Sequence, residues 1–299
     1  MLVFGSRARR KDPHMRWRMG RRSTNIEDRR GVRLPGRFAG GGIGILVLIV
    51  VAVLLGADPS KLLNDITYTG VDQGSYNDGT PLSEEDRELG DFVSVVLADT
   101  EDTWRDIFAR YNGTYREPAL VLFSGAVESA CGYAGAAVGP FYCPADEKVY
   151  IDLSFYRELK ERFNAPGDFA QAYVIAHEVG HHVQNLLGIS EQVSNAQRRL
   201  GGGEANKLSV MLELQADCFA GVWAHNADRA RDILERGDVE EGLNAASSIG
   251  DDRLQMQSQG RVAPDSFTHG TSKQRVAWFK RGLDSGEMES CNTFEAANL

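Results

Sequence analysis

Residues 174–183 read VIAHEVGHHV and contain the pattern H-E-x-x-H, formed by His177, Glu178 and His181. Apolar residues recur at helical spacing on both sides of it, so we predict a helix over residues 168–187. Residues four apart lie on one face of an α-helix, one turn above each other. Two imidazoles placed in this way can bind one Zn²⁺, and the glutamate can act as a general base. The stretch therefore predicts a metal site within a largely apolar helix.

The third ligand decides which kind of zinc site the pattern forms. A metzincin would continue with glycine at 184 and histidine at 187, but this chain has Gln184 and Leu187, which excludes that branch. Another branch takes a glutamate from a later helix, with an aspartate one turn on. Glu213 and Asp217 have this spacing in a predicted helix over residues 204–227. They could be a solvated acidic pair, but apolar neighbours favour Glu213 as a metal ligand and Asp217 as the acceptor of a histidine N–H.

Charge is distributed unevenly along the 299 residues. Residues 1–37 hold 12 Lys or Arg and three acids, whereas the remainder holds 21 basic and 39 acidic residues, a net charge of −18. Nucleic acid requires a basic face, so we predict no nucleic-acid partner. Residues 38–57 contain no charged side chain, and their number matches the roughly 20 residues that span a bilayer core.

These features divide the chain into four parts. We predict a basic cytoplasmic tail (1–37), a transmembrane helix (38–57), a linker (58–82) and a domain (83–299). A cleaved signal peptide is the competing interpretation, but its apolar core is usually shorter, about 7–15 residues. The positive-inside rule keeps the tail in the cytoplasm and places the domain outside, in the cell envelope. Met15, which opens the sequence MRWR, is a second candidate for the start of the chain.

Four cysteines agree with a domain in an oxidising compartment, and none forms a C-x-x-C pair. An even number suggests two disulfides, for which three pairings exist. We favour Cys131–Cys143, which would close a short glycine-rich loop, and Cys218–Cys291, which would tie the C-terminal tail to a central helix. Four buried free thiols are the alternative if the domain lies inside the cell.

The remaining pattern predicts an α+β domain that is mainly helical with a small sheet. The sheet would come from residues 118–153 and cover the helices that hold the metal. Residues 124–138 are either an edge strand or a loop. Besides the two helices given above, we expect helices over residues 83–111 (with a break near 99–100), 154–163, 189–200, 239–257 and 272–283.

From about residue 15 to 295 the chain resembles the bacterial neutral zinc metallopeptidases of the YpfJ type. The motifs that carry the resemblance are MRWR (15–18), NIEDRRG (25–31), HEVGHHVQ (177–184), ELQADC (213–218), NAASSIGDDRLQ (244–255) and FTHGTSKQR (267–275). The resemblance implies a zincin-like fold of the gluzincin type in a membrane-anchored bacterial protein. It does not supply a substrate.

The predicted chemistry follows from one catalytic Zn²⁺. Three protein ligands leave a fourth position for a water, whose pKa falls towards about 7 on the metal. Glu178 would take the proton of that water and deliver it to the leaving amine. His269 is our candidate for stabilising the oxyanion, and Arg275 and Tyr142 are weaker candidates. His182 is expected to pack beside the site.

The leading hypothesis is a membrane-anchored zinc endopeptidase that acts on peptides or proteins outside the cytoplasm. A non-catalytic, zinc-stabilised binding or chaperone-like module of the envelope is the alternative, because an H-E-x-x-H pattern can also hold a structural ion. A third possibility is hydrolysis of a non-peptide amide at the same zinc. The sequence sets neither the substrate nor the oligomeric state.

Overall fold

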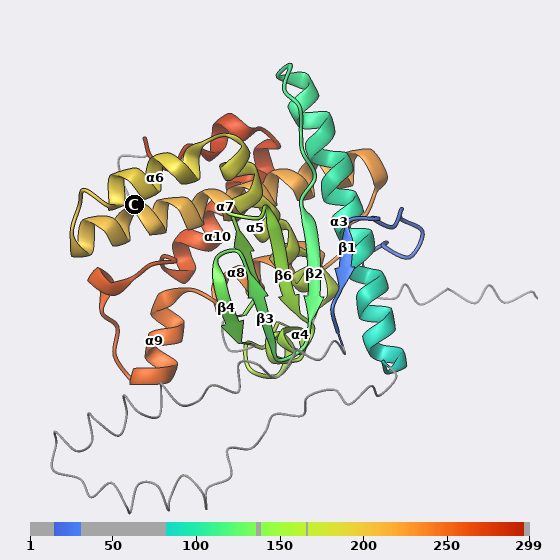
Figure 1. Ribbon diagram of the computed structural model, residues 1–299, viewed down its shortest axis with the longest axis horizontal. Helices are drawn as coiled ribbons and strands as arrows, with labels where there is room; N and C mark the ends of the chain where they lie inside the picture. The colour runs from blue at the N-terminus through green and yellow to red at the C-terminus, as the bar shows by residue number, and fades with distance from the viewer. Residues whose placement is uncertain (1–14, 31–81, 136–138, 166, 296–299) are drawn as a thin grey trace, which may run out of the picture.

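A computed structural model describes residues 15–30, 82–135, 139–165 and 167–295 (Figure 1). Its main sheet has the strand order β1-β2-β6-β5. β1 (Ile26–Asp28), β2 (Ala119–Phe123) and β6 (Lys148–Asp152) are parallel, and β5 (Phe141–Cys143) runs antiparallel to β6 at one edge. A separate hairpin joins β3 (Ala126–Ser129) and β4 (Gly132–Gly135), so residues 124–138 hold strands of their own. The prediction of a mainly helical α+β fold with a small sheet is confirmed.

Helices make up most of the described chain. They are α3 (Glu84–Arg110), α4 (Ser154–Glu161), α5 (Asp168–Leu186), α6 (Ile189–Gln197), α7 (Gly202–Arg231), α8 (Asp238–Ser248), α9 (Asp251–Gln259) and α10 (Ser272–Ser285), with short 3₁₀ turns η3 (Pro264–Ser266) and η4 (Met288–Cys291). α3 begins at the Ser83 cap, as its acidic first turn predicts, and continues through residues 99–100 without a break. The single helix predicted over 239–257 is instead two helices. They separate at Gly250, where a Cβ would lie 2.4 Å from the backbone nitrogen of Ser272.

The helix α5 lies at the centre of the fold. It contacts β5 and β6 of the sheet on one side and α3, α7 and α8 on the others (Figure 1). Its apolar residues are almost all fully buried, including Phe169, Tyr173 and Val179. Burial of this many apolar side chains holds the helix rigidly between the sheet and α7. The H-E-x-x-H pattern therefore sits on a fixed element.

Residues 15–30 are part of the domain, which corrects the predicted boundary at residue 83. β1 pairs with β2 in the sheet, and the Trp17 ring packs edge-on against Phe92 of α3 at 5.3 Å between centroids. Three of the arginines predicted to lie in a cytoplasmic tail, Arg18, Arg21 and Arg22, bind acids of α3, as in the 2.7 Å pair between Arg21 and Glu101. The pairing partners lie about 70–100 residues further along the chain, so the local sequence gave no sign of this packing.

This packing also limits how the chain can cross a membrane. Segments on opposite sides of a bilayer cannot share a sheet, so residues 15–30 cannot form a tail that a membrane separates from the domain. The predicted transmembrane helix 38–57 and linker 58–82 lie outside the described residues. Among the described residues, no helix is both long and apolar enough to span a membrane.

Both favoured disulfides are present. Cys131 at the end of the β3–β4 hairpin is bonded to Cys143 of β5, and Cys218 of α7 is bonded to Cys291 of η4. The first bond ties the hairpin to the edge of the main sheet. The second ties the C-terminal segment to the helix that carries Glu213 and Asp217.

Candidate metal centre

Two helices bring the three predicted ligands together. His177 and His181 come from α5, and Glu213 comes from α7, which crosses it. The Nε2 atom of His177 lies 3.2 Å from one Glu213 carboxylate oxygen, and that of His181 lies 3.5 Å from the other. One donor atom from each residue lies within 4.8 Å of the other two. All three side chains are at most one-fifth exposed.

This grouping fits zinc. Bonds of about 2.0–2.1 Å in a tetrahedron separate neighbouring ligand atoms by roughly 3.3 Å. The separations of 3.2 and 3.5 Å, each to a different oxygen of Glu213, lie close to that value. Two imidazole nitrogens and one carboxylate form a donor set that zinc prefers, and three protein ligands are typical of a catalytic site. The residues present therefore match the ion that the sequence predicts.

The pKa values show how strongly the ligand groups interact. Burial lowers the pKa of His177, but the nearby Asp217 carboxylate outweighs it and brings the pKa to about 10. Burial raises the pKa of Glu213, but the two histidines more than reverse this and hold it well below its usual range. A metal ion bound by these residues would likewise stabilise the Glu213 carboxylate, and its binding would release protons from the ligand groups.

Glu178 lies in the same buried region as the ligands and is 7% exposed. Its burial raises the pKa of its carboxyl group, and the neighbouring His177 and His181 only partly oppose this effect. A carboxylate with a raised pKa is a better acceptor for a proton near neutral pH. The position and environment suit a general base beside the three ligands.

Asp217 supports His177 from the side opposite Glu213. Its Oδ1 atom lies 2.8 Å from His177 Nδ1, so the imidazole donates this hydrogen and leaves Nε2 free for a metal. Arg275 of α10 donates two hydrogen bonds to the same carboxylate, at 2.8 and 2.9 Å, and Tyr173 donates a third. Burial raises the pKa of Asp217, but the Arg275 charge outweighs it and brings the pKa to about 2. Asp217 therefore stays ionised over the physiological pH range.

Glycines allow these helices to approach closely. A Cβ at Gly180, between the two histidines, would lie 3.0 Å from the backbone oxygen of Ala216 on α7. A Cβ at Gly282 of α10 would lie 1.9 Å from the backbone oxygen of Cys218, and Gly221 of α7 meets α10 in the same way. A Cβ at Gly221 or Gly282 would overlap the backbone of the neighbouring helix, and one at Gly180 would require α7 to shift by a few tenths of an ångström. These positions therefore set the distances at which Glu213 and Arg275 reach α5.

His269 lies in the loop before α10 and has a carboxylate partner. Its Nδ1 atom is 3.2 Å from Asp251, the first residue of α9, and this bond raises the pKa of His269. The other Asp251 oxygen accepts the backbone N–H groups of residues 268, 269 and 270. Gly270 packs on Val210 and Leu214 of α7, which lie three residues before and one residue after Glu213. The histidine is half exposed and is held at the edge of the site.

Three other predicted residues have different roles. His182 accepts or donates through both ring nitrogens, with Tyr142 Oη at 3.0 Å and the Arg116 carbonyl at 2.6 Å, so it packs beside the site as expected. Tyr142 is engaged by His182 and Asn185. Arg275 is buried and bound to Asp217. Tyr142 and Arg275 both have hydrogen-bond partners in this structure, so we continue to favour His269 for stabilising an oxyanion.

Comparison with known proteins agrees with this geometry. Residues 15–294 match a family described as "Putative neutral zinc metallopeptidase". The chain belongs to this family. It is 51% identical over 291 residues to the protein YpfJ of Escherichia coli K12, a match that covers 94% of this chain and 99% of the relative. It is 38% identical over 259 residues to the protein Rv2575 of Mycobacterium tuberculosis, covering 83% of this chain and 86% of that relative. No solved structure matches the chain.

Sequence reasoning missed two supporting residues of this metallopeptidase site. Asp251 lies in the motif over residues 244–255, which carries the family resemblance but assigns this carboxylate no role. Its place at the start of a helix was the available signal, because a carboxylate there often binds backbone N–H groups. Gln184 was used only to exclude the metzincin branch. In the structure its Oε1 atom lies 2.8 Å from His181 Nδ1. Its position three residues after the second histidine was the signal available.

Proposed function

We propose that this chain is a zinc-dependent peptidase with one metal ion bound by His177, His181 and Glu213. The supporting observation is the convergence of these three donors beside Glu178, a buried carboxylate whose pKa is raised. Membership of a zinc metallopeptidase family supports the same reaction class. A structural zinc site has four protein ligands, whereas this group has three among the described residues. We therefore favour catalysis over a binding or chaperone-like role.

Each residue has a defined task in peptide hydrolysis. Bound zinc supplies a Lewis acid that polarises a carbonyl and makes water more acidic. Glu178 takes the proton of the attacking water and returns it to the leaving amine. His269, oriented by Asp251, donates a hydrogen bond to the oxygen that becomes negative, an interaction worth about 2.7–4 kcal/mol in other hydrolases. Cleavage within peptide chains, rather than at their ends, is the expected specificity.

The decisive experiment replaces the base and keeps the ligands. Glu178→Gln in the full chain should abolish chelator-sensitive cleavage of a peptide library while the zinc content, measured by mass spectrometry, stays near one ion per chain. Glu204→Gln is the control, because Glu204 is an exposed glutamate of α7 paired only with Lys207. Full activity of Glu178→Gln would refute the proposed mechanism. A zinc-loaded wild-type chain that cleaves nothing would favour the binding-module alternative.

We also propose that the domain lies outside the cytoplasm, because two disulfides in one domain are typical of an oxidising compartment. Residues 15–30 would then lie on the same side, since they share its sheet. Met19 is 98% exposed and Met256 is 53% exposed, so single Met19→Cys and Met256→Cys variants can report on both parts. A thiol reagent that does not cross the inner membrane should label both. Labelling of only Met256→Cys would instead support the prediction that residues 15–30 lie in the cytoplasm, and would contradict their shared location with the domain.

A further inference from the structure

A chain of neutral hydrogen bonds connects His181 with the C-terminal disulfide. His181 Nδ1 lies 2.8 Å from the Oε1 atom of Gln184. The amide nitrogen of Gln184 donates to the Leu212 carbonyl at 2.7 Å and to Gln215 Oε1 at 3.1 Å. Gln215 in turn donates to the carbonyl of Cys291 at 3.0 Å. Both glutamines are buried, and neither has a task in the reaction described above.

The Cys291 carbonyl determines which group donates and which accepts in each of these hydrogen bonds. A backbone carbonyl can only accept, so the amide nitrogen of Gln215 must face Cys291 and its oxygen must face Gln184. Gln184 must then present its nitrogen to Gln215 and to the Leu212 carbonyl, and its oxygen to His181. His181 Nδ1 is therefore the donor, and its Nε2 lone pair points to the Glu213 side.

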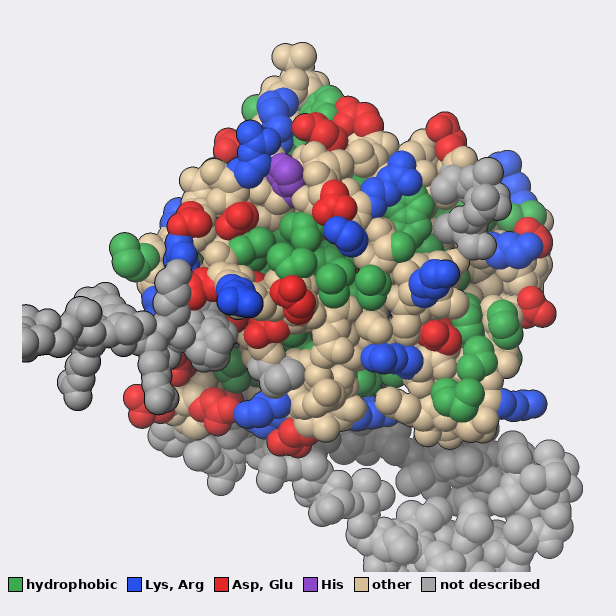
Figure 2. All heavy atoms as spheres, turned by 180° about the vertical axis from the view of Figure 1, so that it is seen from behind, with side chains coloured by type: hydrophobic (Ala, Val, Ile, Leu, Met, Phe, Trp, Pro, Cys, Tyr) green, Lys and Arg blue, Asp and Glu red, His purple; other side chains and the backbone are tan. Residues whose placement is uncertain are grey.

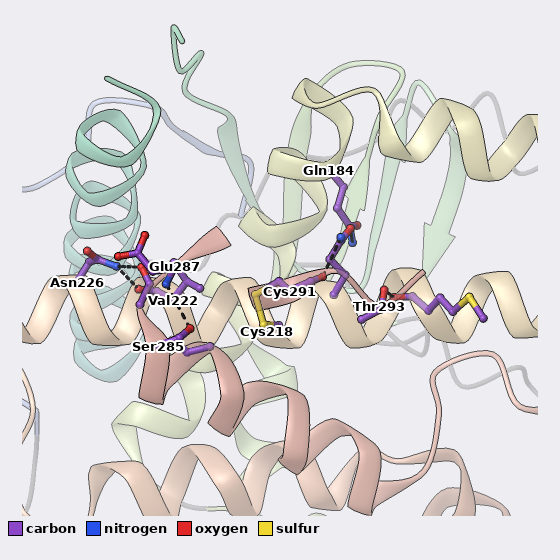
Figure 3. Close-up of a disulfide and its surroundings, with 12 residues drawn as sticks. Gln184, Cys218, Val222, Asn226, Ser285, Glu287, Cys291 and Thr293 are labelled. Carbon is purple, nitrogen blue, oxygen red and sulfur yellow. Dashed lines mark hydrogen bonds between the residues drawn. A yellow bond between two sulfur atoms is a disulfide. The ribbon is translucent and has the colours of Figure 1, made fainter. Parts of the chain in front are cut away.

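The Cys218–Cys291 disulfide holds in place the Cys291 carbonyl, which accepts the hydrogen bond from Gln215. Cys218 and Cys291 are fully buried, and their bond holds η4 against α7 next to Gln215 (Figure 3). Beyond the bond, Thr293 donates to the Met211 carbonyl at 2.7 Å, so the segment is attached to α7 again. Among the described residues, the two glutamines thus form a hydrogen-bonded path from the C-terminal segment to His181.

We infer that Gln184 is a positioning residue that sets the tautomer and orientation of His181, and that the Cys218–Cys291 disulfide secures this arrangement through Gln215. The inference rests on the proposed zinc site. It makes the oxidised state of the C-terminal segment a condition for full metal affinity. Leu212 gives Gln184 a second anchor, so loss of Gln215 should weaken the arrangement less than loss of Gln184 itself.

The first test measures zinc affinity by competition with a chromogenic chelator in the full chain. Gln184→Met keeps the length of the side chain and removes its hydrogen bonds, and we expect about 10–100-fold weaker zinc binding. Gln197→Met is the matched control, because Gln197 also donates two hydrogen bonds to α7, to Ala205 and Ser209, but contacts no histidine. Equal losses in both variants, or less than a twofold loss in Gln184→Met, would overturn the inference.

The second test concerns the disulfide. Gln215→Met should weaken zinc binding several-fold, and Cys218→Ser with Cys291→Ser should do the same. A variant that combines Gln215→Met with the two cysteine changes should lose no more zinc affinity than either variant alone. The reason is that both variants disturb the same contact, between Gln215 and the Cys291 carbonyl. Additive losses would show that the disulfide does not act through Gln215. A Gln215→Met loss without any effect of the cysteine changes would refute the disulfide's part.

These readouts separate the inference from the proposed function. A chain that binds zinc, loses affinity in Gln184→Met and cleaves no peptide would refute the peptidase and leave the inference intact. An active peptidase with unchanged zinc affinity in Gln184→Met would refute the inference alone.

Discussion

The two histidines of the motif stand one turn apart on α5, yet their supports differ in kind. His177 faces an ionised carboxylate, Asp217, which an arginine and a tyrosine hold in place. His181 faces a neutral amide, Gln184, which only neutral groups hold. Both supports fix the same tautomer, with Nδ1 as donor and Nε2 towards Glu213. The support of His177 consists of the charged pair Asp217–Arg275, whereas the support of His181 consists of the neutral amides of Gln184 and Gln215.

Electrostatics explain why only one support is charged. Each charge added to a buried site costs free energy unless a partner compensates it. Asp217 and Arg275 cancel one another, so the charged support adds no net charge to a zinc ion bound by one carboxylate. A second carboxylate at residue 184 would have needed another buried cation. The amide orients His181 without that demand, at the expense of a weaker hold on the imidazole.

The face of the molecule opposite to that of Figure 1 has no comparable separation of charge. Figure 2 shows acidic and basic side chains interspersed over the face opposite to that of Figure 1, with apolar side chains between them and no broad basic area among the residues described there. The organised charge of the described chain lies inside, at the site.

The largest effect should follow from breaking the charged support. Asp217→Ala leaves the buried Arg275 without its carboxylate, and loss of one partner of a buried pair costs about 3–5 kcal/mol. We expect the free energy of unfolding in urea to fall by that amount. Zinc affinity should also fall about 10–100-fold, because His177 loses its acceptor.

Replacing the neutral support provides the comparison for this prediction. Gln184→Met leaves no buried charge without a partner, so its loss of stability should be clearly smaller, about 1–3 kcal/mol, for a similar loss of zinc affinity. If Asp217→Ala and Gln184→Met destabilised the chain equally, the distinction between a charged and a neutral support would be wrong.

Much of this site could be predicted from spacing, because its parts on α5 and α7 are local. His177 and His181, and likewise Glu213 and Asp217, are four residues apart on a helix. The partners that hold them are distant: Arg275 lies 58 residues after Asp217, and Gln215 lies 31 residues after Gln184. No local pattern encodes such contacts. For the same reason residues 15–30 resembled a free basic tail, although acids of α3 pair with Arg18, Arg21 and Arg22.

An intermediate effect should follow from separating the two helices that carry the ligands. In Gly180→Ala the new Cβ would lie 3.0 Å from the Ala216 oxygen and 3.1 Å from its Cα, so α7 must move by a few tenths of an ångström. Glu213 contacts both histidines and would shift from both. We expect a loss of about 1–3 kcal/mol in stability and weaker zinc binding through both supports.

Gly203→Ala isolates this contact from helix propensity. Gly203 is also helical, in the first turn of α7, but no atom lies within 4 Å of a Cβ built there. Alanine should stabilise this variant by up to about 1 kcal/mol. If Gly180→Ala were stabilised in the same way and kept its zinc affinity, the close approach of α5 and α7 would not set the position of Glu213.

The smallest effect should come from the third histidine, which has a carboxylate partner like His177 but is half exposed like a surface residue. The hydrogen bond that His269 donates to Asp251 raises the pKa of His269, with Glu213 adding to this effect and burial and Arg275 opposing it. Asp251→Asn removes the carboxylate and should therefore lower the pKa of His269. Because His269 donates to the oxyanion most strongly when protonated, the alkaline limb of kcat/KM should move to lower pH. The asparagine oxygen can still accept the backbone N–H groups that shape the loop. Asp252→Asn is the control, because Asp252 binds only Ser272. A pH profile of Asp251→Asn that coincides with that of Asp252→Asn would show that a carboxylate partner matters only where water is excluded, as it is at His177.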